Sequence, residues 1–323
     1  MPDVLMTAPY MIPFLDRFQP VFKHYQIHLI IPEVNERLEE SDLFEYAGNF
    51  DGTICGDDRY SRNVLEKCSP RLRVIAKWGT GTDSIDHLAC KELGIQLLNT
   101  TNAFTIPVSD SVLGYILAFA RQQPWMDRAI KNGVWQKIPG RALSECTLGV
   151  IGVGNIGKAV LRRAHSFGMT LLGTDNQPTS QDFLLENEVK MVSLEEILKR
   201  SDFVSINCDL NPTSYHLLNR STFKLMKPSS ILINTARGPI VEESALIEAL
   251  EQKTISGAAL DVFEHEPLPA SSPLLKMDQV LLAPHNSNSS PVAWEGVHWN
   301  TIRNLLMGLK LEPADLSKWQ KSI

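Results

Sequence analysis

The sequence predicts an α/β protein built on parallel sheets, and three observations support this fold class. Short apolar runs rich in β-branched residues alternate with longer amphipathic runs, which is the pattern of successive βαβ units. A glycine-rich turn directly follows one of the apolar runs. The chain has 323 residues, of which 43% are hydrophobic and 21% charged. This length and composition suit two domains with cores of their own.

Roughly the first hundred residues predict one small α/β unit. Helical patterns at 61–67 and 84–93 separate short apolar segments in this part of the chain. The expected strands are 4–8, 27–31, 52–55, 73–77 and 95–98. Because strands alternate with helices, we expect these strands to be parallel.

A second series of βαβ units begins at residue 147, after a helical pattern at 108–121 and a polar loop at 131–146. Its six expected strands are 148–151, 170–173, 203–207, 231–234, 256–260 and 280–282. Six strands with intervening helices match a dinucleotide-binding domain in number. A last helical run at 291–309 follows the sixth strand. Its return to the first unit would make that unit discontinuous.

Composition excludes several other classes of function. The formal net charge is −6, and Lys and Arg form no run, so we expect no nucleic-acid partner. The five cysteines are odd in number and contain no CxxC pair, which favours reduced thiols in the cytoplasm. We expect no membrane span, because no long apolar run occurs. We expect no metal site, because no His/Cys/Asp cluster has ligand spacing.

The glycine-rich turn is Gly152-x-Gly154-x-x-Gly157, between an expected strand and a helical run at 158–167. In that context Gly152 allows a tight turn, Gly154 lets the backbone approach a pyrophosphate, and Gly157 lets helix and strand pack closely. The free N–H groups and the dipole at the helix N-terminus attract the anion. A merely tight βα turn is the alternative, and the strand–turn–helix context favours a dinucleotide.

Asp175 ends the next expected strand, 18 residues after Gly157, close to the ~20-residue spacing of the acid that binds the adenosine ribose. A carboxylate there accepts both ribose hydroxyls and repels a 2′-phosphate. No Arg or Lys follows within the next few residues to bind that phosphate. The sequence therefore predicts NAD rather than NADP, with a turn-capping aspartate as the alternative.

Three polar residues, Arg237, Glu266 and His285, follow later strands of the same series. Each residue alone has an ordinary structural explanation, as a surface ion pair, a solvated acid or a turn residue. In a parallel sheet, however, the carboxyl ends of all strands lie at the edge that binds dinucleotide. We therefore expect all three side chains to reach the nicotinamide.

The oxidation of a 2-hydroxy acid needs such a set of residues. A hydride leaves C2 while a proton leaves the hydroxyl group, and histidine titrates in the range that suits the base. A neighbouring carboxylate orients the imidazole and stabilises its cationic form. An arginine fork binds the substrate carboxylate and polarises the 2-oxo group.

These motifs resemble those of the D-isomer-specific 2-hydroxyacid dehydrogenases, the group that includes D-3-phosphoglycerate dehydrogenase. The matching segments, in family order, are 77–86, 148–157, 234–239, 260–267 and 283–285. The resemblance implies a Rossmann-type doubly wound parallel sheet at 103–288 that binds NAD. This domain would be inserted in a smaller flavodoxin-like α/β substrate domain formed by 1–102 and 289–323.

The resemblance also implies a role for each matching position. Arg237 would orient the substrate and His285 would be the acid/base. Glu266 would be its partner, preferred to Glu264 because it directly precedes Pro267. Substrate would be bound by the backbone of Gly79, Thr80 and Gly81. The expected cofactor-binding residues are Gly152, Gly154, Asn155, Ile156, Gly157, Asp175, Cys208, Thr235, Ala236 and Asp261.

The substrate and the oligomeric state remain open at this point. Lys77 stands where phosphoglycerate dehydrogenases can carry a cation for the substrate phosphate, but a solvated or ion-paired lysine explains it equally well. Asp209 and the polar run 286–290 depart from the family pattern. We expect a small polar D-2-hydroxy acid, such as D-3-phosphoglycerate or the glycerate/hydroxypyruvate pair. The family also implies a homodimer, formed through the helix at 108–121 and its following loop.

Two other functions are compatible with the sequence. One is a non-enzymatic, NAD-sensing binding protein similar to the family's transcriptional corepressors, and the other is a dehydrogenase of formate or phosphonate-like anions. Turnover of 2-oxo acids would distinguish them. Trp294, His298 and Trp299 are spaced as a packed helical face, so we expect them in a core or interface rather than in a substrate site.

Overall fold

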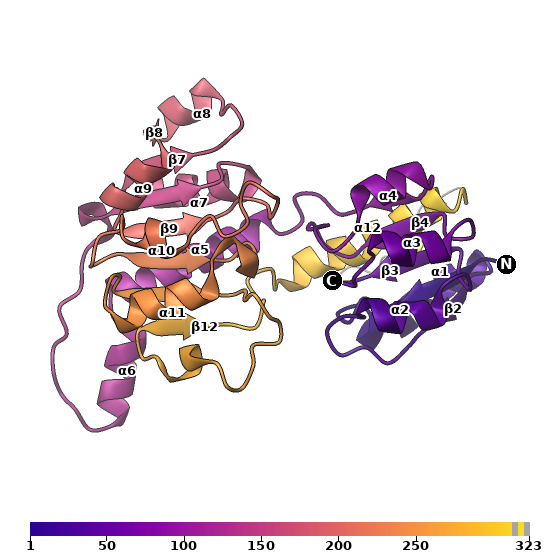
Figure 1. The fold of residues 1–323 in the computed structure, drawn as a ribbon, viewed down its shortest axis with the longest axis horizontal. Helices are drawn as coiled ribbons and strands as arrows, with labels where there is room; N and C mark the ends of the chain where they lie inside the picture. The colour runs from indigo at the N-terminus through magenta and orange to yellow at the C-terminus, as the bar shows by residue number, and fades with distance from the viewer. Residues whose placement is uncertain (312–315, 320–323) are drawn as a thin grey trace. The chain divides into compact units, whose positions relative to one another are not determined.

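The computed structural model describes residues 1–311 and 316–319. The chain forms two compact units. The terminal unit comprises Met1–Ala103 and Ser290–Ile323, and the inserted unit comprises Phe104–Ser289. The chain therefore leaves the first unit, completes the second, and returns to the first (Figure 1).

The terminal unit contains a five-stranded parallel sheet in the order β2-β1-β3-β4-β5. This is the flavodoxin-like order. The strands are β1 (Asp3–Met6), β2 (His28–Ile30), β3 (Gly52–Cys55), β4 (Val74–Lys77) and β5 (Gln96–Leu98). The helices are α1 (Leu15–His24), α2 (Glu40–Tyr46), α3 (Arg62–Cys68), α4 (His87–Glu92) and α12 (Pro291–Gly308), with 3-10 turns η1 (Ile12–Phe14) and η5 (Leu316–Trp319). Helix α12 packs against β3, β4 and β5.

The inserted unit contains a seven-stranded parallel sheet in the order β12-β11-β10-β9-β6-β7-β8. The order reverses between β6 and β9, which is the switch point of a Rossmann-type sheet. The strands are β6 (Thr147–Ile151), β7 (Thr170–Thr174), β8 (Val189–Met191), β9 (Phe203–Ile206), β10 (Ile231–Asn234), β11 (Gly257–Leu260) and β12 (Val280–Leu282).

The helices of the inserted unit cover both faces of its sheet, and residues alternate between the two cores along each strand. In β10, for example, Leu232 faces the core with α9, α10 and α11, whereas Ile231 and Ile233 face the core with α5 and α7. The helices are α5 (Thr105–Ala120), α6 (Gln123–Lys131), α7 (Asn155–Ser166), α8 (Gln181–Glu186), α9 (Leu194–Arg200), α10 (Arg220–Phe223) and α11 (Glu243–Glu251), with 3-10 turns η2 (Leu143–Glu145), η3 (Gly238–Ile240) and η4 (Pro273–Lys276). The predicted doubly wound sheet is confirmed.

Several details differ from the sequence predictions, and three examples come from the inserted unit. The sheet has a seventh strand, β8, which is short and lies at the sheet edge. Helix α5 begins at Thr105 rather than at residue 108, with Pro107 in its first turn. Helix α6 was not predicted, because it follows α5 after only two residues and its buried face is weak.

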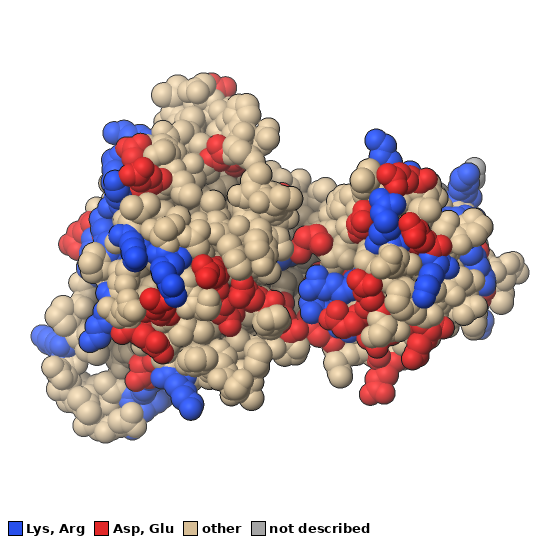
Figure 2. Space-filling model, viewed as in Figure 1, with Lys and Arg blue, Asp and Glu red and all other residues tan. Residues whose placement is uncertain are grey.

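The surface of each unit carries charges of both signs. Figure 2 shows Lys and Arg interspersed with Asp and Glu on the face in view of each unit. Among the residues that the structure describes, no helix combines the length and apolar character needed to cross a membrane.

Candidate active site

The carboxyl ends of the inserted unit's strands lie along one edge of its sheet, since all seven are parallel. The glycine-rich turn follows β6 at this edge and leads directly into α7. Gly152 has φ +91°, a conformation that side chains rarely adopt. A Cβ at Gly157 would overlap the carbonyl oxygen of Gly152. The lack of a side chain at both glycines therefore allows the start of α7 to pack closely against the turn.

Gly154 is the N-cap of α7 and faces open space. A Cβ built there has no neighbouring atom within 4 Å. The first N–H groups of α7 have no partner within a helix and attract negative charge. This bare backbone at a helix N-terminus fits the pyrophosphate of a dinucleotide.

Asp175 follows β7 beside this turn. Its Oδ2 accepts a hydrogen bond from the Val153 backbone at 2.6 Å, and its Oδ1 accepts one from Gln177 at 2.8 Å. Each oxygen has a second lone pair, so the carboxylate is held in place and keeps capacity to accept ribose hydroxyls. The turn, the helix N-terminus and this acid together fit NAD.

The next strands end in polar atoms that the rest of the described chain does not satisfy. Asn207 Oδ1 after β9 and Thr235 Oγ1 after β10 are buried without a hydrogen-bond partner among those residues. Buried polar atoms normally have a partner, so a polar ligand at this edge would complete them. Cys208 and Ala236 stand beside these two residues. Burial raises the pKa of the Cys208 thiol to about 11, which keeps it neutral. Asn207 was not among the predicted site residues, although its place at a strand end was a signal.

Asp261, a predicted cofactor residue, has a second role in the structure. Its carboxylate accepts backbone hydrogen bonds from Asn286 and Ser287, each at 2.8 Å. Its side chain lies almost wholly inside the unit, with 1% of the residue exposed. Asp261 therefore shapes the segment that follows His285, and its contact with the cofactor stays a prediction.

Arg237 follows β10 in a turn that Asn234 organises. Asn234 Nδ2 donates to the Arg237 carbonyl at 2.9 Å, while Asn234 Oδ1 accepts from the Ala236 backbone at 3.1 Å. The guanidinium donates to the Ala236 carbonyl at 2.8 Å. Arg237 is also the N-cap of η3. These hydrogen bonds hold the backbone of Arg237 and one N–H of its guanidinium at the sheet edge.

His285 and Glu266 are in direct contact. His285 Nδ1 lies 3.0 Å from Glu266 Oε2. Glu266 Oε1 accepts a hydrogen bond from the Phe263 backbone at 2.9 Å, which orients the carboxylate. His285 has φ +50°, and its N–H donates to the Asp261 carbonyl at 2.8 Å. Such a backbone is unusual for a non-glycine residue and is found where structure holds a functional side chain. Glu264, the other candidate acid, contacts His216 instead.

The Gly79–Gly81 loop belongs to the terminal unit, where it follows β4. Thr80 Oγ1 donates to the Thr100 carbonyl at 2.9 Å, and Asn99 Nδ2 donates to the Thr80 carbonyl at 2.6 Å. The Gly79 carbonyl accepts from the Thr100 backbone at 2.9 Å. The segment after β5 thus holds the loop in one conformation.

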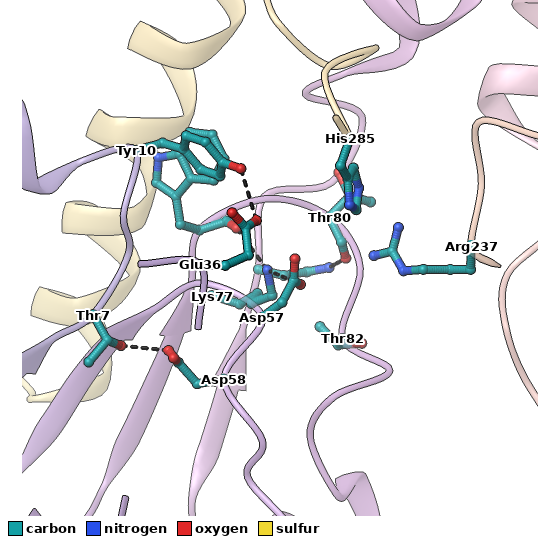
Figure 3. A network of polar contacts seen from close by, with 12 residues as sticks. Thr7, Tyr10, Glu36, Asp57, Asp58, Lys77, Thr80, Thr82, Arg237 and His285 are labelled. Atoms are coloured by element: carbon teal, nitrogen blue, oxygen red, sulfur yellow. Dashed lines mark hydrogen bonds and ion pairs between the residues drawn. The ribbon is translucent and has the colours of Figure 1, made fainter. Parts of the chain in front are cut away.

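Lys77 is the last residue of β4 and is only 3% exposed. Its Nζ lies 3.1 Å from Asp57 Oδ1 and donates to the Trp78 carbonyl at 2.9 Å (Figure 3). Of the two explanations that the sequence left open, the ion-paired lysine describes this arrangement. Asp57 therefore already supplies a counter-charge for Lys77 within the same unit.

The terminal unit contains two buried titratable side chains, Asp58 and His298, whose pKa values are shifted. Asp58 accepts hydrogen bonds from Thr7 Oγ1 and from the Leu38 backbone, each at 2.6 Å (Figure 3). Burial raises the pKa of Asp58 to about 6, against the lowering by these bonds. His298 Nδ1 accepts from Trp78 Nε1 at 2.9 Å, and burial lowers the pKa of His298 to about 4. His298 and Trp299 are buried in the unit, as expected for a packed face.

A family model for the NAD binding domain of D-isomer specific 2-hydroxyacid dehydrogenases matches residues 113–287, which is more than half of the chain. The chain belongs to the D-isomer specific 2-hydroxyacid dehydrogenase family. The predicted family and the predicted NAD cofactor are therefore confirmed, and this dehydrogenase is an NAD-dependent oxidoreductase. No group of three or more His, Cys, Asp or Glu in the described residues is arranged to hold a metal ion.

Several relatives show what this dehydrogenase is similar to. A glyoxylate reductase of Korarchaeum cryptofilum is 39% identical over 72% of this chain and 71% of that enzyme. A D-3-phosphoglycerate dehydrogenase of Methanocaldococcus jannaschii is 38% identical over 81% of this chain and 50% of that enzyme. The D-lactate dehydrogenase of Aquifex aeolicus, solved with NAD and lactic acid, has a TM-score of 0.82 at 26% identity, covering 97% of this chain and all of that one.

Proposed function

We propose that this dehydrogenase interconverts a small polar 2-oxo acid and its D-2-hydroxy acid, with Arg237, Glu266 and His285 as its catalytic residues. The observation that carries the proposal is the 3.0 Å contact between His285 Nδ1 and Glu266 Oε2. This histidine–carboxylate pair lies in the unit that carries the dinucleotide turn, after strands of the same sheet. An acid/base pair at the cofactor edge is what hydride transfer to a carbonyl requires.

The proposal gives each ring nitrogen of His285 a role, supported by the contact with Glu266. A carboxylate only accepts hydrogen bonds, so Nδ1 of His285 carries the hydrogen that points at Glu266. Nε2 is then the atom that exchanges a proton with the substrate oxygen. When bound at this edge, the nicotinamide supplies or accepts the hydride. Glu266 stabilises the imidazolium that forms during oxidation, because its negative charge is held 3.0 Å away.

Arg237 binds the negatively charged substrate and polarises its 2-oxo group. Its guanidinium keeps its charge at all relevant pH values and offers a planar fork that matches a carboxylate. In the proposal, the terminal unit is the substrate domain, and the backbone N–H groups of its residues Gly79, Thr80 and Gly81 bind substrate. The hydrogen bonds that fix this loop support that role, because rigid donors lose little entropy on binding.

The preferred substrate is a 2-oxo acid with a small, uncharged polar side chain, such as hydroxypyruvate. The relatives named glyoxylate reductase, D-3-phosphoglycerate dehydrogenase and D-lactate dehydrogenase support a small substrate. The polar run 286–290 after His285 supports a polar one. The ion pair of Lys77 with Asp57 argues against a phosphate, because it already neutralises the lysine charge.

Turnover of a substrate panel tests this function. Purified protein is mixed with NADH and with glyoxylate, hydroxypyruvate, 3-phosphohydroxypyruvate or 2-oxoisocaproate, and kcat/KM is measured for each acid. We expect hydroxypyruvate to exceed 2-oxoisocaproate by roughly 10-fold or more, since a site with polar donors rejects an apolar group. A preference for 2-oxoisocaproate would refute the polar substrate. Turnover of none of the acids, together with normal NADH binding, would refute the enzymatic proposal.

A homodimer in the cytoplasm is part of the proposal. Helix α6 and its following loop expose Ile130, Val134 and Trp135, and Trp135 is 92% exposed. Exposed apolar side chains in one segment indicate a contact surface, and this segment follows α5, as the family predicts. Sedimentation of the natural chain and of Trp135→Ser tests the dimer. A wild-type monomer at micromolar concentration would contradict it.

A further inference from the structure

The inserted unit contains a second histidine–glutamate pair, close in sequence to the first. His216 Nε2 lies 2.5 Å from Glu264 Oε1, and both side chains are partly buried. Glu264 and Glu266 are separated by one residue, so their carboxylates reach different histidines. Neither His216 nor Glu264 has a place in the chemistry proposed above.

His216 is bonded to the loop that carries Arg237. Its backbone N–H donates to the Pro239 carbonyl at 2.9 Å, two residues after Arg237. Two residues later, Leu218 donates to the Ile240 carbonyl at 3.1 Å, and Leu218 forms a short parallel bridge with Val241. The backbone of His216 is thus hydrogen-bonded to the loop that carries Arg237, while its side chain contacts Glu264 in the loop that carries Glu266.

The two loops are also packed directly against each other. A Cβ added at Gly238 would overlap the backbone carbonyl of Phe263, so no larger residue fits between the loops. On the other side, the Glu264 backbone N–H donates to Glu243 Oε2 at 3.3 Å, at the start of α11. Any displacement of 263–266 is therefore transmitted to Gly238, next to Arg237.

His216 is held in an unusual conformation. It has φ +48°, and its ring stacks on Tyr215 with a centroid distance of 4.0 Å. A non-glycine residue in this region persists only where its surroundings enforce it. The hydrogen bonds to Glu264 and Pro239, and the one that Asn219 Nδ2 donates to the His216 carbonyl at 3.0 Å, are among the contacts that do so here.

We propose that His216 and Glu264 are positioning residues, which fix Arg237 and Glu266 relative to each other through the contact of their two loops. This inference rests on the proposed function of Arg237 and Glu266. The pair touches neither substrate nor cofactor in this scheme. Its loss misplaces the guanidinium and the carboxylate, and displacements on the order of 1 Å lower rates strongly.

The test compares Glu264→Gln, His216→Gln and the double variant with the natural enzyme and with Glu248→Gln. Glu248→Gln is the matched control, since it breaks an ion pair with Arg220 in the same unit and neither residue belongs to either loop. The measurements are kcat/KM for the best 2-oxo acid, the Kd of NADH by fluorescence, the melting temperature, and the pH profile. The pH profile of Glu266→Gln is recorded for comparison.

We expect each single variant to lower kcat/KM roughly 10- to 100-fold and to leave the Kd of NADH unchanged. The double variant should lose no more than the worse single variant, because both changes break one contact. The pH limb that reports His285 should keep its position in Glu264→Gln and move to lower pH in Glu266→Gln, since the Glu266 carboxylate contacts His285 and the Glu264 carboxylate contacts His216.

A loss of kcat/KM no larger than in Glu248→Gln would overturn the positioning role, whatever the melting temperatures. A loss of NADH affinity in both single variants that adds up in the double variant would also overturn the positioning role. Such a result would indicate general damage to the unit. Failure of the natural enzyme to turn over any 2-oxo acid is a different result. It would refute the proposed function, and the inference with it.

Discussion

The two units treat polar groups at the carboxyl ends of their strands differently. In the terminal unit, Lys77 is paired with Asp57, and both oxygens of Asp58 accept hydrogen bonds. In the inserted unit, Asn207 Oδ1 and Thr235 Oγ1 are buried with no partner in the part of the chain that the structure describes. An unsatisfied buried polar atom costs about 1–3 kcal/mol. Ser61 Oγ and Ser84 Oγ, in the loops after β3 and β4, are likewise buried without a partner in the described residues. The difference therefore lies in the residues that directly end the strands: Lys77 of the terminal unit is paired within its own unit, whereas Asn207 and Thr235 of the inserted unit are left for a polar ligand.

The largest effect is expected from His285→Ala. It removes the group proposed to exchange a proton at the inserted unit's edge, and general acid/base catalysis contributes roughly 10²- to 10⁴-fold. We expect kcat to fall by about 100-fold or more with little change in the Kd of NADH. His24→Ala is the control, because His24 is exposed in the last turn of α1. A natural rate in His285→Ala would remove the proposed acid/base.

A smaller effect is expected from Asp175→Ala, which tests whether the same edge selects its cofactor. Removal of the carboxylate eliminates the hydrogen bonds to the ribose and the repulsion of a 2′-phosphate. The NAD/NADP ratio of kcat/KM should narrow by a factor corresponding to about 1–3 kcal/mol. Asp182→Ala on α8, an exposed aspartate, should leave the ratio unchanged. An unchanged ratio in Asp175→Ala would show that this carboxylate does not select the cofactor.

The smallest effects concern stability, where two buried groups of the terminal unit should act in opposite directions. Burial lowers the pKa of His298 to about 4, below the ordinary value of 6.5. The unfolded chain therefore binds the proton more tightly, and stability is lost as pH falls from about 6.5 to 4. Asp58 has a pKa raised to about 6, so its contribution to stability is present at low pH and is lost as pH rises from about 4 to 6.

Urea unfolding between pH 4 and pH 7 checks both signs. His298→Gln should lose less stability than the natural protein on acidification, by about 1–3 kcal/mol. Asp58→Asn should lose more on acidification, because it lacks the group that takes up a proton in the folded state. The opposite order of the two variants would show that the burial of these groups does not control their titration.

Local sequence patterns predicted most of the inserted unit. The expected strands 231–234 and 280–282 have the bounds of β10 and β12, because both strands are short apolar runs. The three residues of β8 were missed although β12, at the other sheet edge, is equally short. Lys190 interrupts the apolar run in β8, whereas β12 is apolar throughout.

Some site residues could also be predicted from local sequence patterns, and others could not. The glycine turn and Asp175 follow from spacing, since a βα turn is built from neighbouring residues. The resemblance to the family selected Glu266 rather than Glu264, and the structure brings Glu266 to His285. The sequence contained no signal for His216, because a histidine in a polar loop resembles many surface residues. Lys77 had two equally good explanations until its partner Asp57 was located.

The sequence by itself determined the fold class, the dinucleotide turn and the family, because these depend on hydrophobic periodicity and on short motifs. Only the tertiary structure decided which carboxylate meets which histidine. Glu264 and His216 are 48 positions apart, and Glu266 and His285 are 19 apart. Contacts over such separations depend on how parallel strands order themselves in the sheet and bring their loops together. That order is set by the packing of helices on both faces, which local patterns do not specify.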